Sequence, residues 1–456
     1  MTETSASNDK VGFRRALGPF DAAMVVIGGI IGGGIFINPY IVAQRLDSPG
    51  LVLAAWIAGG AIAIAGALTF AELGSLFPKA GGQYVYLRDA FHPFAGFLYG
   101  WALLLMIESG AIAAIATAFA EYTLRFLGRP DSASTPLAIA AIVILAAVNY
   151  LGVKPGSRVL NVFVVLKVAA LVLLIGAGLV MPAGDAAPAG SGGASSSLLP
   201  LAFGAALIPI MFSYGGWQNL NYVAEEMKDA RRDLPRAMIA GIAVVVGIYL
   251  LVNFVYLRAL GHGGLAATQT PAADTAGALL GNFGDRAVAL AIAISTFGFL
   301  DLTMLAPTRV YYAMAADGVF FPAVARLHPR YRSPHVAIII QTGWALLLAL
   351  TGTYAQLVDY VVFADWIFFG LAGATVFVFR ARVPLSQRGT GTFRMPGYPV
   401  IPALFVIAAV SVVASVLWSA PMRSLIGVGL LATGVPAFVY WRRRAQTAVA
   451  AARPSA

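Results

Sequence analysis

Two glycine clusters interrupt apolar stretches of the sequence in a way that could bind a charged ligand. The first is IGGIIGGGIFINP at 27–39, and the second is FSYGGWQNLNYVAEE at 212–226. Consecutive glycines are poor helix formers, and each costs roughly 1 kcal/mol relative to alanine. Within a membrane, unwound backbone is tolerated only where protein buries it or where it faces a watery cavity. The clusters therefore predict two broken helices beside a cavity.

The backbone at such breaks offers the partners that both charged groups of an α-amino acid need. The half-helix that begins near Gly33 and Gly34 presents free N–H groups and the positive end of a helix dipole, which suit a carboxylate. Carbonyl groups left unpaired near Ile30 and Phe212 can accept hydrogen bonds from an ammonium. The alternative is that the glycines only allow close helix packing. Two clusters at matching places in two halves of the chain favour a binding site.

Ionisable residues inside predicted membrane spans are functional candidates, and Lys167 and Glu108 are the strongest of them. Lys167, in the fifth span, either extends to the interface through its four-carbon stem or supplies a fixed cation within the protein. Glu108, near the middle of the third span, has three open roles: a protonated structural group, a proton-coupling group, or a counter-charge for a cationic substrate. Asp301 and Asp365 are weaker cases of the same kind, and a structural hydrogen bond is expected for Asp365.

Three other glutamates lie near the ends of spans, where structural roles are expected. Glu72 precedes a loop on the inner side and is placed near the water boundary. Glu225 and Glu226 are expected to pair with the basic loop Lys228–Arg236.

The sequence contains no pattern of a catalytic or metal site. The four histidines are scattered without ligand spacing, and the GxSxG, HExxH and P-loop patterns are absent. The chain also has no cysteine, which excludes disulfides, thiolate nucleophiles and cysteine metal ligands. We therefore expect no enzyme, no cofactor and no metal site. A channel would need a continuous polar pore, and nothing in the sequence predicts one.

Apolar segments of membrane-spanning length must position these residues. Of the 456 residues, 59% are hydrophobic and 11% are charged, whereas a soluble domain has about a quarter charged residues. Segments of roughly 20 apolar residues can cross the hydrocarbon core, and they recur along almost the whole chain. We predict an all-α integral membrane protein with twelve transmembrane helices, near 18–45, 50–77, 91–127, 136–153, 159–181, 201–224, 236–260, 286–312, 334–352, 356–380, 400–420 and 423–441.

Lysine and arginine residues are distributed unequally between the two sides of these spans. With the N-terminus inside, 23 of the 30 lie on the inner side, six on the outer side, and Lys167 within a span. This bias fits the positive-inside rule with both termini cytoplasmic. The net charge of +10 thus reflects orientation and not a nucleic-acid partner. The first residues lack the features of a signal peptide, so a retained first span and an inner-membrane location are expected.

Several motifs resemble the amino acid–polyamine–organocation superfamily, and its L-type amino acid transporter branch in particular. The principal ones are IIGGGIF (30–36) and SYGGWQNLNYVAEE (213–226); further similar stretches are AELGSLFPKAGGQYVYL (71–87), STFGFLDLTMLAPTRVYYAMAADG (295–318) and DWIFFGLAG (365–373). The resemblance implies a LeuT-like fold of two inverted five-helix repeats with broken helices one and six. Its expected parts are a cytoplasmic tail 1–17, a first repeat 18–182, an external linker 183–200, a second repeat 201–380, two trailing helices 381–441 and a cytoplasmic tail 442–456.

The resemblance also implies roles for individual residues around the breaks. The substrate carboxylate would contact Gly32, Gly33 and Gly34. The substrate amine would contact the carbonyls of Ile30 and Phe212 together with Gly215, and the Phe212 ring would cover the site. Trp217 would lie just past the second break.

Two charged residues receive coupling roles from the same resemblance. Glu108 would lie beside the substrate, and Lys167 would replace a second sodium ion between helices one and eight. The implied function is sodium-independent transport of neutral amino acids by alternating access, through exchange or proton coupling. The alternative is transport of cationic amino acids or polyamines, because of Glu108.

The sequence departs from its relatives at positions that bear on these expectations. Many relatives have serine or alanine where Gly33 stands, and Gln218 replaces the usual asparagine or aspartate. Eukaryotic L-type chains bind a heavy chain through an external cysteine, and this chain has none. The expected partners are therefore a small-molecule amino acid and membrane lipid, without a disulfide-linked heavy chain.

Overall fold

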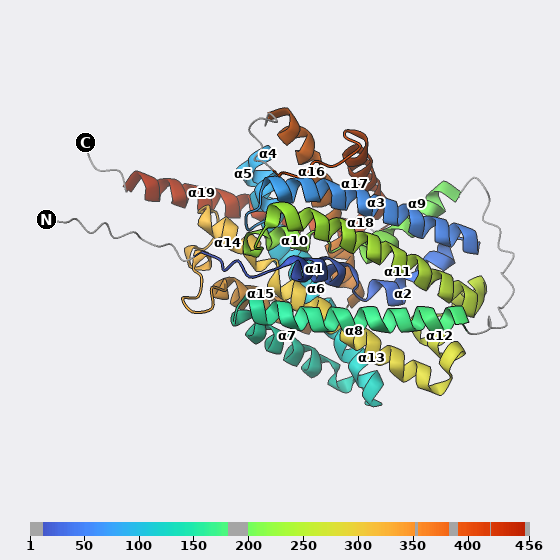
Figure 1. Cartoon of the computed structure of the whole chain (residues 1–456). Coiled ribbons are helices and arrows are strands. Elements are labelled where there is room, and N and C mark those ends of the chain that lie inside the picture. The colour runs from blue at the N-terminus through green and yellow to red at the C-terminus, as the bar shows by residue number, and fades with distance from the viewer. Residues whose placement is uncertain (1–11, 181–198, 352–353, 383–390, 420, 452–456) are drawn as a thin grey trace.

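The computed structural model describes residues 12–180, 199–351, 354–382, 391–419 and 421–451, and these residues form a bundle of helices (Figure 1). Across these ranges the only β-type pairing is a single bridge between Leu17 and Met227. The first described residues and the end of the last helix lie at the same end of the bundle (Figure 1). The predicted all-α class is confirmed for the part of the chain that is described.

Within the described residues, nine helical segments are long and apolar enough to cross a membrane. They are Pro19–Arg45, Pro49–Leu76, Pro93–Leu127, Val153–Val180, Ala230–Ala267, Arg286–Ala316, Ala364–Arg382, Val400–Trp418 and Ser424–Thr447. Three shorter apolar helices, Ser134–Tyr150, Leu199–Ser213 and His335–Leu350, fall in the other predicted spans. The chain is a multi-pass membrane protein.

The first half of the chain forms eight α-helices and two short helical turns. They are α1 (Pro19–Ile30), α2 (Gly34–Arg45), α3 (Pro49–Leu76), α4 (Gln83–Ala90), α5 (Pro93–Ala102), the π-helical η1 (Leu103–Ile107), α6 (Glu108–Leu127), η2 (Asp131–Ala133), α7 (Ser134–Tyr150) and α8 (Val153–Val180). Local signals set some of these boundaries. The Ser48 side chain accepts a hydrogen bond from the backbone N–H of Leu51 at 3.3 Å and caps α3, which then begins at a proline.

The second half begins after the predicted external linker. Its elements are α9 (Leu199–Ser213), α10 (Asn219–Tyr222), η3 (Ala224–Glu226), α11 (Ala230–Ala267), α12 (Pro271–Leu280), α13 (Asn282–Leu305), α14 (Thr308–Ala316), η4 (Pro322–Ala325), α15 (His335–Thr351), α16 (Tyr354–Arg382), α17 (Val400–Ser419), α18 (Pro421–Ala432) and α19 (Gly434–Ala451). The predicted linker is 183–200. Its small and polar part, 183–197, lies outside the described residues.

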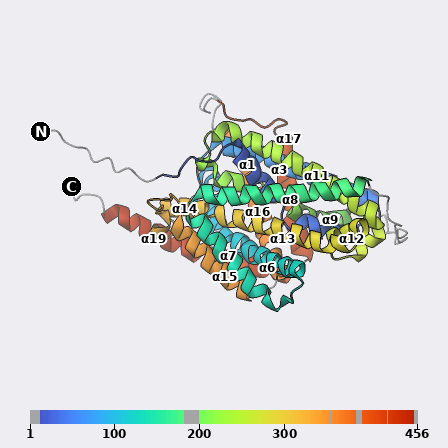
Figure 2. The same cartoon turned by 60° about the horizontal axis from the view of Figure 1, so that its bottom comes forward.

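The broken helix α1–α2 lies in the interior of the bundle. α1 packs against α8, α11 and α13, and α2 packs against α9 and α11. α13 lies along α6 and α8, while α15 covers α6 and α7 (Figure 2). Large apolar side chains are exposed on the outer helices, for example Leu173 on α8 at 73% and Trp418 on α17 at 91%. Exposed apolar surface of this extent is expected where helices face lipid.

Candidate functional site

The structure contains both predicted helix breaks, and it brings them into contact. α1 ends at Ile30 and α2 begins at Gly34, while α9 ends at Ser213 and α10 begins at Asn219. Gly216, in the second break, has a φ of +104° and lies directly against the first break. A side chain there would be strained by its backbone conformation and blocked by the neighbouring chain. Two segments nearly 190 residues apart in the sequence thus cross at one point.

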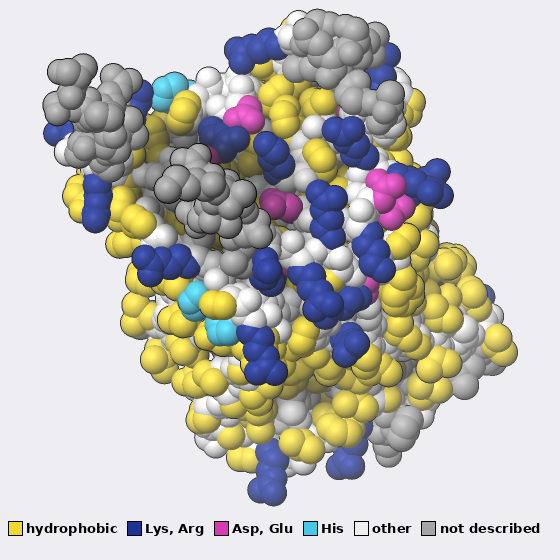
Figure 3. Space-filling view, turned by 60° about the vertical axis from the view of Figure 1, so that its left-hand side comes forward, with side chains coloured by type: hydrophobic (Ala, Val, Ile, Leu, Met, Phe, Trp, Pro, Cys, Tyr) yellow, Lys and Arg dark blue, Asp and Glu magenta, His cyan; other side chains and the backbone are white. Residues whose placement is uncertain are grey.

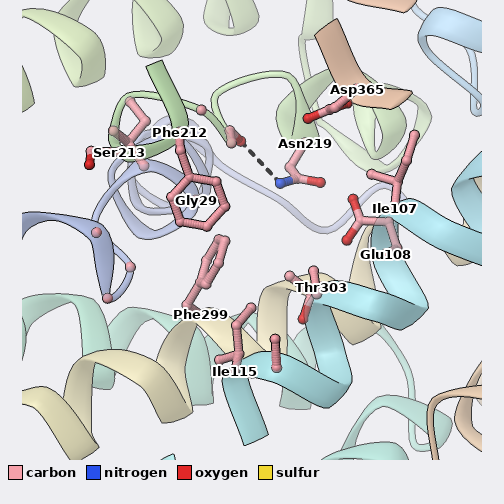
Figure 4. Close-up of a pocket in the computed structure, with 18 of the residues that line it drawn as sticks. Gly29, Ile107, Glu108, Ile115, Phe212, Ser213, Asn219, Phe299, Thr303 and Asp365 are labelled. Carbon is pink, nitrogen blue, oxygen red and sulfur yellow. Dashed lines mark hydrogen bonds between the residues drawn. The ribbon is translucent and has the colours of Figure 1, made fainter. Parts of the chain in front are cut away.

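A cavity lies where the two broken helices meet, and α6, α13 and α16 complete its wall (Figure 4). Its volume is about 90 Å³. One water molecule takes up about 10–15 Å³ of a cavity volume measured in this way. Because a water molecule contains one non-hydrogen atom, the cavity holds roughly six to nine such atoms. Most of the predicted site residues line it, namely Ile30, Gly32, Gly33, Gly34, Glu108, Phe212 and Gly215. Lys167 and Trp217 are outside the lining.

The start of α2 gives the cavity a group of backbone donors. The first N–H groups of any α-helix have no acceptor within the helix, and Gly33 and Gly34 place those of α2 at the cavity wall. A β-carbon at Gly33 would have no atom within 4 Å, whereas one at Gly34 would lie 2.7 Å from Oγ of Ser213. Space for a ligand therefore exists beside Gly33, and Gly34 allows α2 to approach α9.

The carbonyl groups at the breaks already have donors in this conformation. The Ile30 carbonyl accepts from the backbone N–H of Gly32 at 2.9 Å and from the Tyr249 hydroxyl at 3.0 Å. The Phe212 carbonyl accepts from the Gly215 N–H at 3.2 Å. A substrate ammonium at these oxygens would have to share them with, or displace, the present donors.

Tyr249 was missed by the sequence reasoning, although it joins the two breaks. It lies on α11, is fully buried, and its hydroxyl is also 3.2 Å from the Ser213 carbonyl. A buried tyrosine hydroxyl normally has a hydrogen-bond partner. A tyrosine within an apolar span could therefore be identified from the sequence as a residue that bonds to another helix. Its partner, however, depends on how α11 packs against α1 and α9.

Lys167 is fully buried and lies against the first break, on α8. Its ammonium donates to the Gly28 carbonyl at 3.0 Å and also to the Ile31 carbonyl. Ser295, on α13, lies 3.4 Å from the same Ile31 oxygen through its hydroxyl. This geometry does not fit the alternative in which Lys167 extends to the membrane interface. The lysine instead satisfies carbonyls that the break leaves without helical partners.

Glu108 lines the cavity together with two other polar side chains. It is the first residue of α6, directly after η1, and it is 4% exposed. Single π-helical turns are often found at functional sites, but nothing in the sequence predicted this one. Asp365 on α16 and Asn219 on α10 lie on the same side of the cavity as Glu108, and the rings of Phe212 and Phe299 lie on the other side (Figure 4).

Trp217 lies behind the second break and packs among aromatic rings. It stacks on Phe369 with centroids 5.4 Å apart and meets Phe70 edge-on at 4.8 Å. The indole is thus outside the cavity lining but stacks on Phe369, which belongs to that lining.

The remaining acidic residues have partners elsewhere in the fold. Asp301 accepts from the side chain of Asn149 at 2.8 Å, away from the cavity lining. Glu72 is buried and binds Arg380 through both carboxylate oxygens, at 2.9 and 2.6 Å. Among the described residues, no group of three acidic or histidine side chains could hold a metal ion.

The predicted pairing of Glu225 and Glu226 with the loop Lys228–Arg236 is wrong. Glu226 pairs instead with Arg309 of α14 at 2.6 Å, and both side chains are almost fully buried. Glu225 accepts a hydrogen bond from the backbone N–H of Ala80 at 3.0 Å. The error arose because proximity in sequence was taken for proximity in space, whereas the buried Arg309 needs a carboxylate partner.

The comparisons with known proteins cover nearly the whole chain. A family model described as amino acid permease matches residues 17–438. The serine/threonine exchanger SteT of Bacillus subtilis is 30% identical over 436 residues, which are 95% of this chain and 98% of that protein. The human large neutral amino acids transporter small subunit 2 is 32% identical, over 97% of this chain and 84% of its own. The human cystine/glutamate transporter is 31% identical, over 96% and 87% of the two chains.

Proposed function

The chain belongs to the amino acid permease family, and we propose that it exchanges neutral amino acids across the membrane without sodium. The observation that carries this proposal is the meeting of two broken helices at one buried cavity. The backbone donors of α2 and the carbonyls of both breaks offer partners of opposite sign within a small volume, as a zwitterion requires. The size of the cavity suits a small to medium amino acid.

The proposed binding mode follows from these donors and acceptors. The substrate carboxylate binds at Gly32, Gly33 and Gly34, where α2 begins. The ammonium binds near the carbonyls of Ile30 and Phe212, beside Gly215, and displaces part of their present hydrogen bonding. The Phe212 ring covers the bound substrate, and Trp217 holds the second break in place.

Sodium independence is proposed from the position of Lys167. Its buried ammonium already supplies a positive charge to the carbonyls of the first break. A sodium ion bound at those oxygens would have to compete with a fixed cation. Lys167 thus acts as a built-in substitute for the ion, between the first break and the neighbourhood of Ser295 on α13.

The proposed architecture has twelve spans, with helices one to five (18–182) and six to ten (201–380) as inverted repeats. The breaks near the start of each half and the three shorter apolar helices support this count. We propose an inner-membrane location with the tails 1–17 and 442–456 in the cytoplasm. Lysine and arginine side chains gather on the end of the bundle that carries both termini, as this orientation requires (Figure 3).

Alternating access would come from rocking of the helices around the two breaks. Along α6 the cavity lining extends from Glu108 to Ala118, toward the Leu127 end, which the charge distribution places outside. The buried pair Glu226–Arg309 lies on the opposite, inner side. This conformation is therefore proposed to admit substrate from outside.

A cationic substrate is the second candidate, because Glu108 and Asp365 both line the cavity. The three relatives described above carry names that refer to serine and threonine, large neutral amino acids, and cystine and glutamate. Two of these names refer to neutral amino acids and none refers to a cationic one, which favours the neutral class over the cationic class. Because the chain has no cysteine, no disulfide-linked heavy chain can attach to it.

The test is uptake of a labelled amino-acid panel into liposomes that contain the purified protein. The lumen is left empty or preloaded with amino acid, and the sodium and pH gradients are varied separately. Uptake that requires preloading and is unaffected by both gradients is the expected result. Accumulation in empty vesicles only under an inward proton gradient would contradict exchange, and uptake limited to lysine or arginine would favour the cationic candidate.

A further inference from the structure

A second pocket opens on the side of the bundle, between α15 and the helix that α5 and η1 form. Its volume is about 350 Å³, and its described lining consists of apolar side chains and one glycine, Gly343. The indole N–H of Trp101 donates to the Thr433 hydroxyl at 3.0 Å, and that of Trp344 donates to the Leu105 carbonyl at 3.1 Å. This lateral pocket therefore offers a ligand no free polar side chain.

The lateral pocket lies between helices that cross the membrane, so its opening faces hydrocarbon. Two residues of its lining, Ile339 and Phe321, are 60% and 50% exposed, although both are large and apolar. Exposure of this kind is expected on a surface that contacts lipid. By the measure used for the central cavity, 350 Å³ holds roughly 23–35 non-hydrogen atoms. One acyl chain of a phospholipid fits this space and matches its apolar walls.

Arginine side chains of α19 lie next to the lateral pocket. Phe321 of the lining meets the Trp441 ring edge-on, with centroids 4.7 Å apart. The Arg444 guanidinium lies over the same indole, 5.7 Å from its centre. α19 extends beyond the rest of the bundle, at the end where the termini lie (Figure 1). Basic residues at the inner end of a span attract the headgroups of anionic lipids.

Acidic side chains do not neutralise this arginine cluster. Among the described residues, none of the arginines at 442–444 forms an ion pair. The sequence contains neither aspartate nor glutamate after Asp365. The nearby Asp317 already binds Arg88 and the Tyr84 hydroxyl. A headgroup phosphate would therefore find guanidinium groups that no carboxylate holds.

The wall of the lateral pocket also belongs to the helix that positions Glu108 in the central cavity. The Glu108 N–H bonds to the Leu103 carbonyl, in the wide pattern of a π-helical turn. Trp344 bonds to Leu105 within that turn. A chain packed on Trp344 keeps the indole against η1, so occupation of the lateral pocket is linked to the wall of the central cavity.

We propose that the lateral pocket binds an acyl chain of an anionic phospholipid from the inner leaflet, with the headgroup phosphate at Arg444. The bound chain supports η1 through Trp344 and thereby promotes exchange. Binding of the lipid is independent of the substrate, whereas its effect on exchange rests on the proposed function.

Native mass spectrometry of the purified protein measures the binding directly. The protein is incubated with phosphatidylglycerol or with phosphatidylcholine of the same acyl chains, and the lipid that survives removal of detergent is counted. The wild type is expected to retain phosphatidylglycerol in preference. Gly343→Leu fills the pocket without a clash, because a β-carbon there would have no atom within 4 Å, and it is expected to lose that lipid. Gly247→Leu on α11 is the matched control, since its β-carbon would be equally free.

Arg444→Gln separates the headgroup contact from the acyl-chain contact. It is expected to weaken the binding of phosphatidylglycerol about fivefold, which corresponds to about 1 kcal/mol for one basic residue near an anionic headgroup. Binding of phosphatidylcholine should not change. Arg236→Gln on α11 is the control for the loss of one positive charge, because Arg236 is also exposed but lies on another helix.

Exchange is then compared in vesicles of phosphatidylcholine alone and in vesicles that also contain phosphatidylglycerol. The wild type and Gly247→Leu are expected to exchange several-fold faster with phosphatidylglycerol. Exchange by Gly343→Leu should be the same in both vesicles. Trp344→Phe lacks the donor to Leu105 and is expected to retain the lipid but to lose its stimulating effect.

Four outcomes would overturn the inference. They are retention of the lipid by Gly343→Leu, equal retention of phosphatidylglycerol and phosphatidylcholine by the wild type, exchange by the wild type that does not depend on phosphatidylglycerol, and a protein dimer that Gly343→Leu dissociates. The last would make the pocket an interface between two copies of the chain. Selective retention of phosphatidylglycerol without exchange in any vesicle would instead refute the proposed function and support the lipid site.

Discussion

Gly29 and Gly216 lie in backbone contact at the crossing of the two broken helices. A β-carbon on Gly216 would be 1.9 Å from the carbonyl oxygen of Gly29, and one on Gly29 would be 2.5 Å from the carbonyl oxygen of Gly216. No side chain can occupy that space without a shift of the backbone, because both neighbours are main-chain atoms. The contact therefore couples the two halves of the chain at the cavity, and small residues at helix crossings allow such an approach.

The variant Gly216→Ala is expected to prevent correct assembly of the two breaks. It adds the clash with Gly29 to a backbone conformation that costs about 1–3 kcal/mol for a residue other than glycine. Thermal unfolding in detergent, followed by size-exclusion chromatography, should show a clear loss of folded protein. Gly215→Ala is the control, since its β-carbon would be no closer than 3.4 Å to any atom. Equal stability of the two variants would contradict the close crossing.

Gly33→Ser is expected to fold normally and to bind substrate more tightly. Gly33 has a φ of −77° and open space beside it, so the side chain fits. A hydroxyl at the start of α2 can donate to the substrate carboxylate, and one such bond contributes about 0.5–1.5 kcal/mol. The half-saturation concentration should fall by up to about tenfold. Gly34→Ser is the matched control, because its β-carbon would meet Ser213, and loss of exchange is expected there.

Lys167→Met is expected to reduce exchange at least about tenfold. The Gly28 and Ile31 carbonyls would lose a charged donor in a buried place, and each unsatisfied group costs about 1–3 kcal/mol. Lys154→Met is the control, since Lys154 lies on the same helix with a side chain that is 42% exposed. Normal sodium-free exchange by Lys167→Met would show that the fixed cation is dispensable.

Glu226→Gln is expected to destabilise the helix bundle by about 3–5 kcal/mol, because it leaves Arg309 buried without a counter-ion. Burial raises the pKa of Glu226, and the Arg309 guanidinium beside it opposes that shift. The double variant Glu226→Gln/Arg309→Met should recover part of the loss in a thermal unfolding assay. If the double variant is less stable than Glu226→Gln alone, the pair is not the source of the effect.

Local properties of the chain were sufficient to predict an all-α, multi-pass protein and its two helix breaks. The apolar length of a span and the low helix propensity of consecutive glycines act over a few residues, so the interruptions at Gly32–Gly34 and at Gly215–Gly216 could be located from the sequence. Unpaired backbone groups follow directly from a break. Ile30, Gly33 and Phe212, which flank or form these breaks, line one cavity.

Only the tertiary structure decided which groups share that cavity and which partners they find. Asp365 lies beside Glu108, Tyr249 bonds to Ile30, and Arg309 lies on Glu226 because distant helices pack together. Such pairs depend on the rotation and depth of each helix within the bundle, and a uniformly apolar helix carries little sequence information about either. The sequence by itself thus determined a membrane protein with two broken helices, and long-range packing brought those breaks together with Glu108 and Asp365 at one cavity.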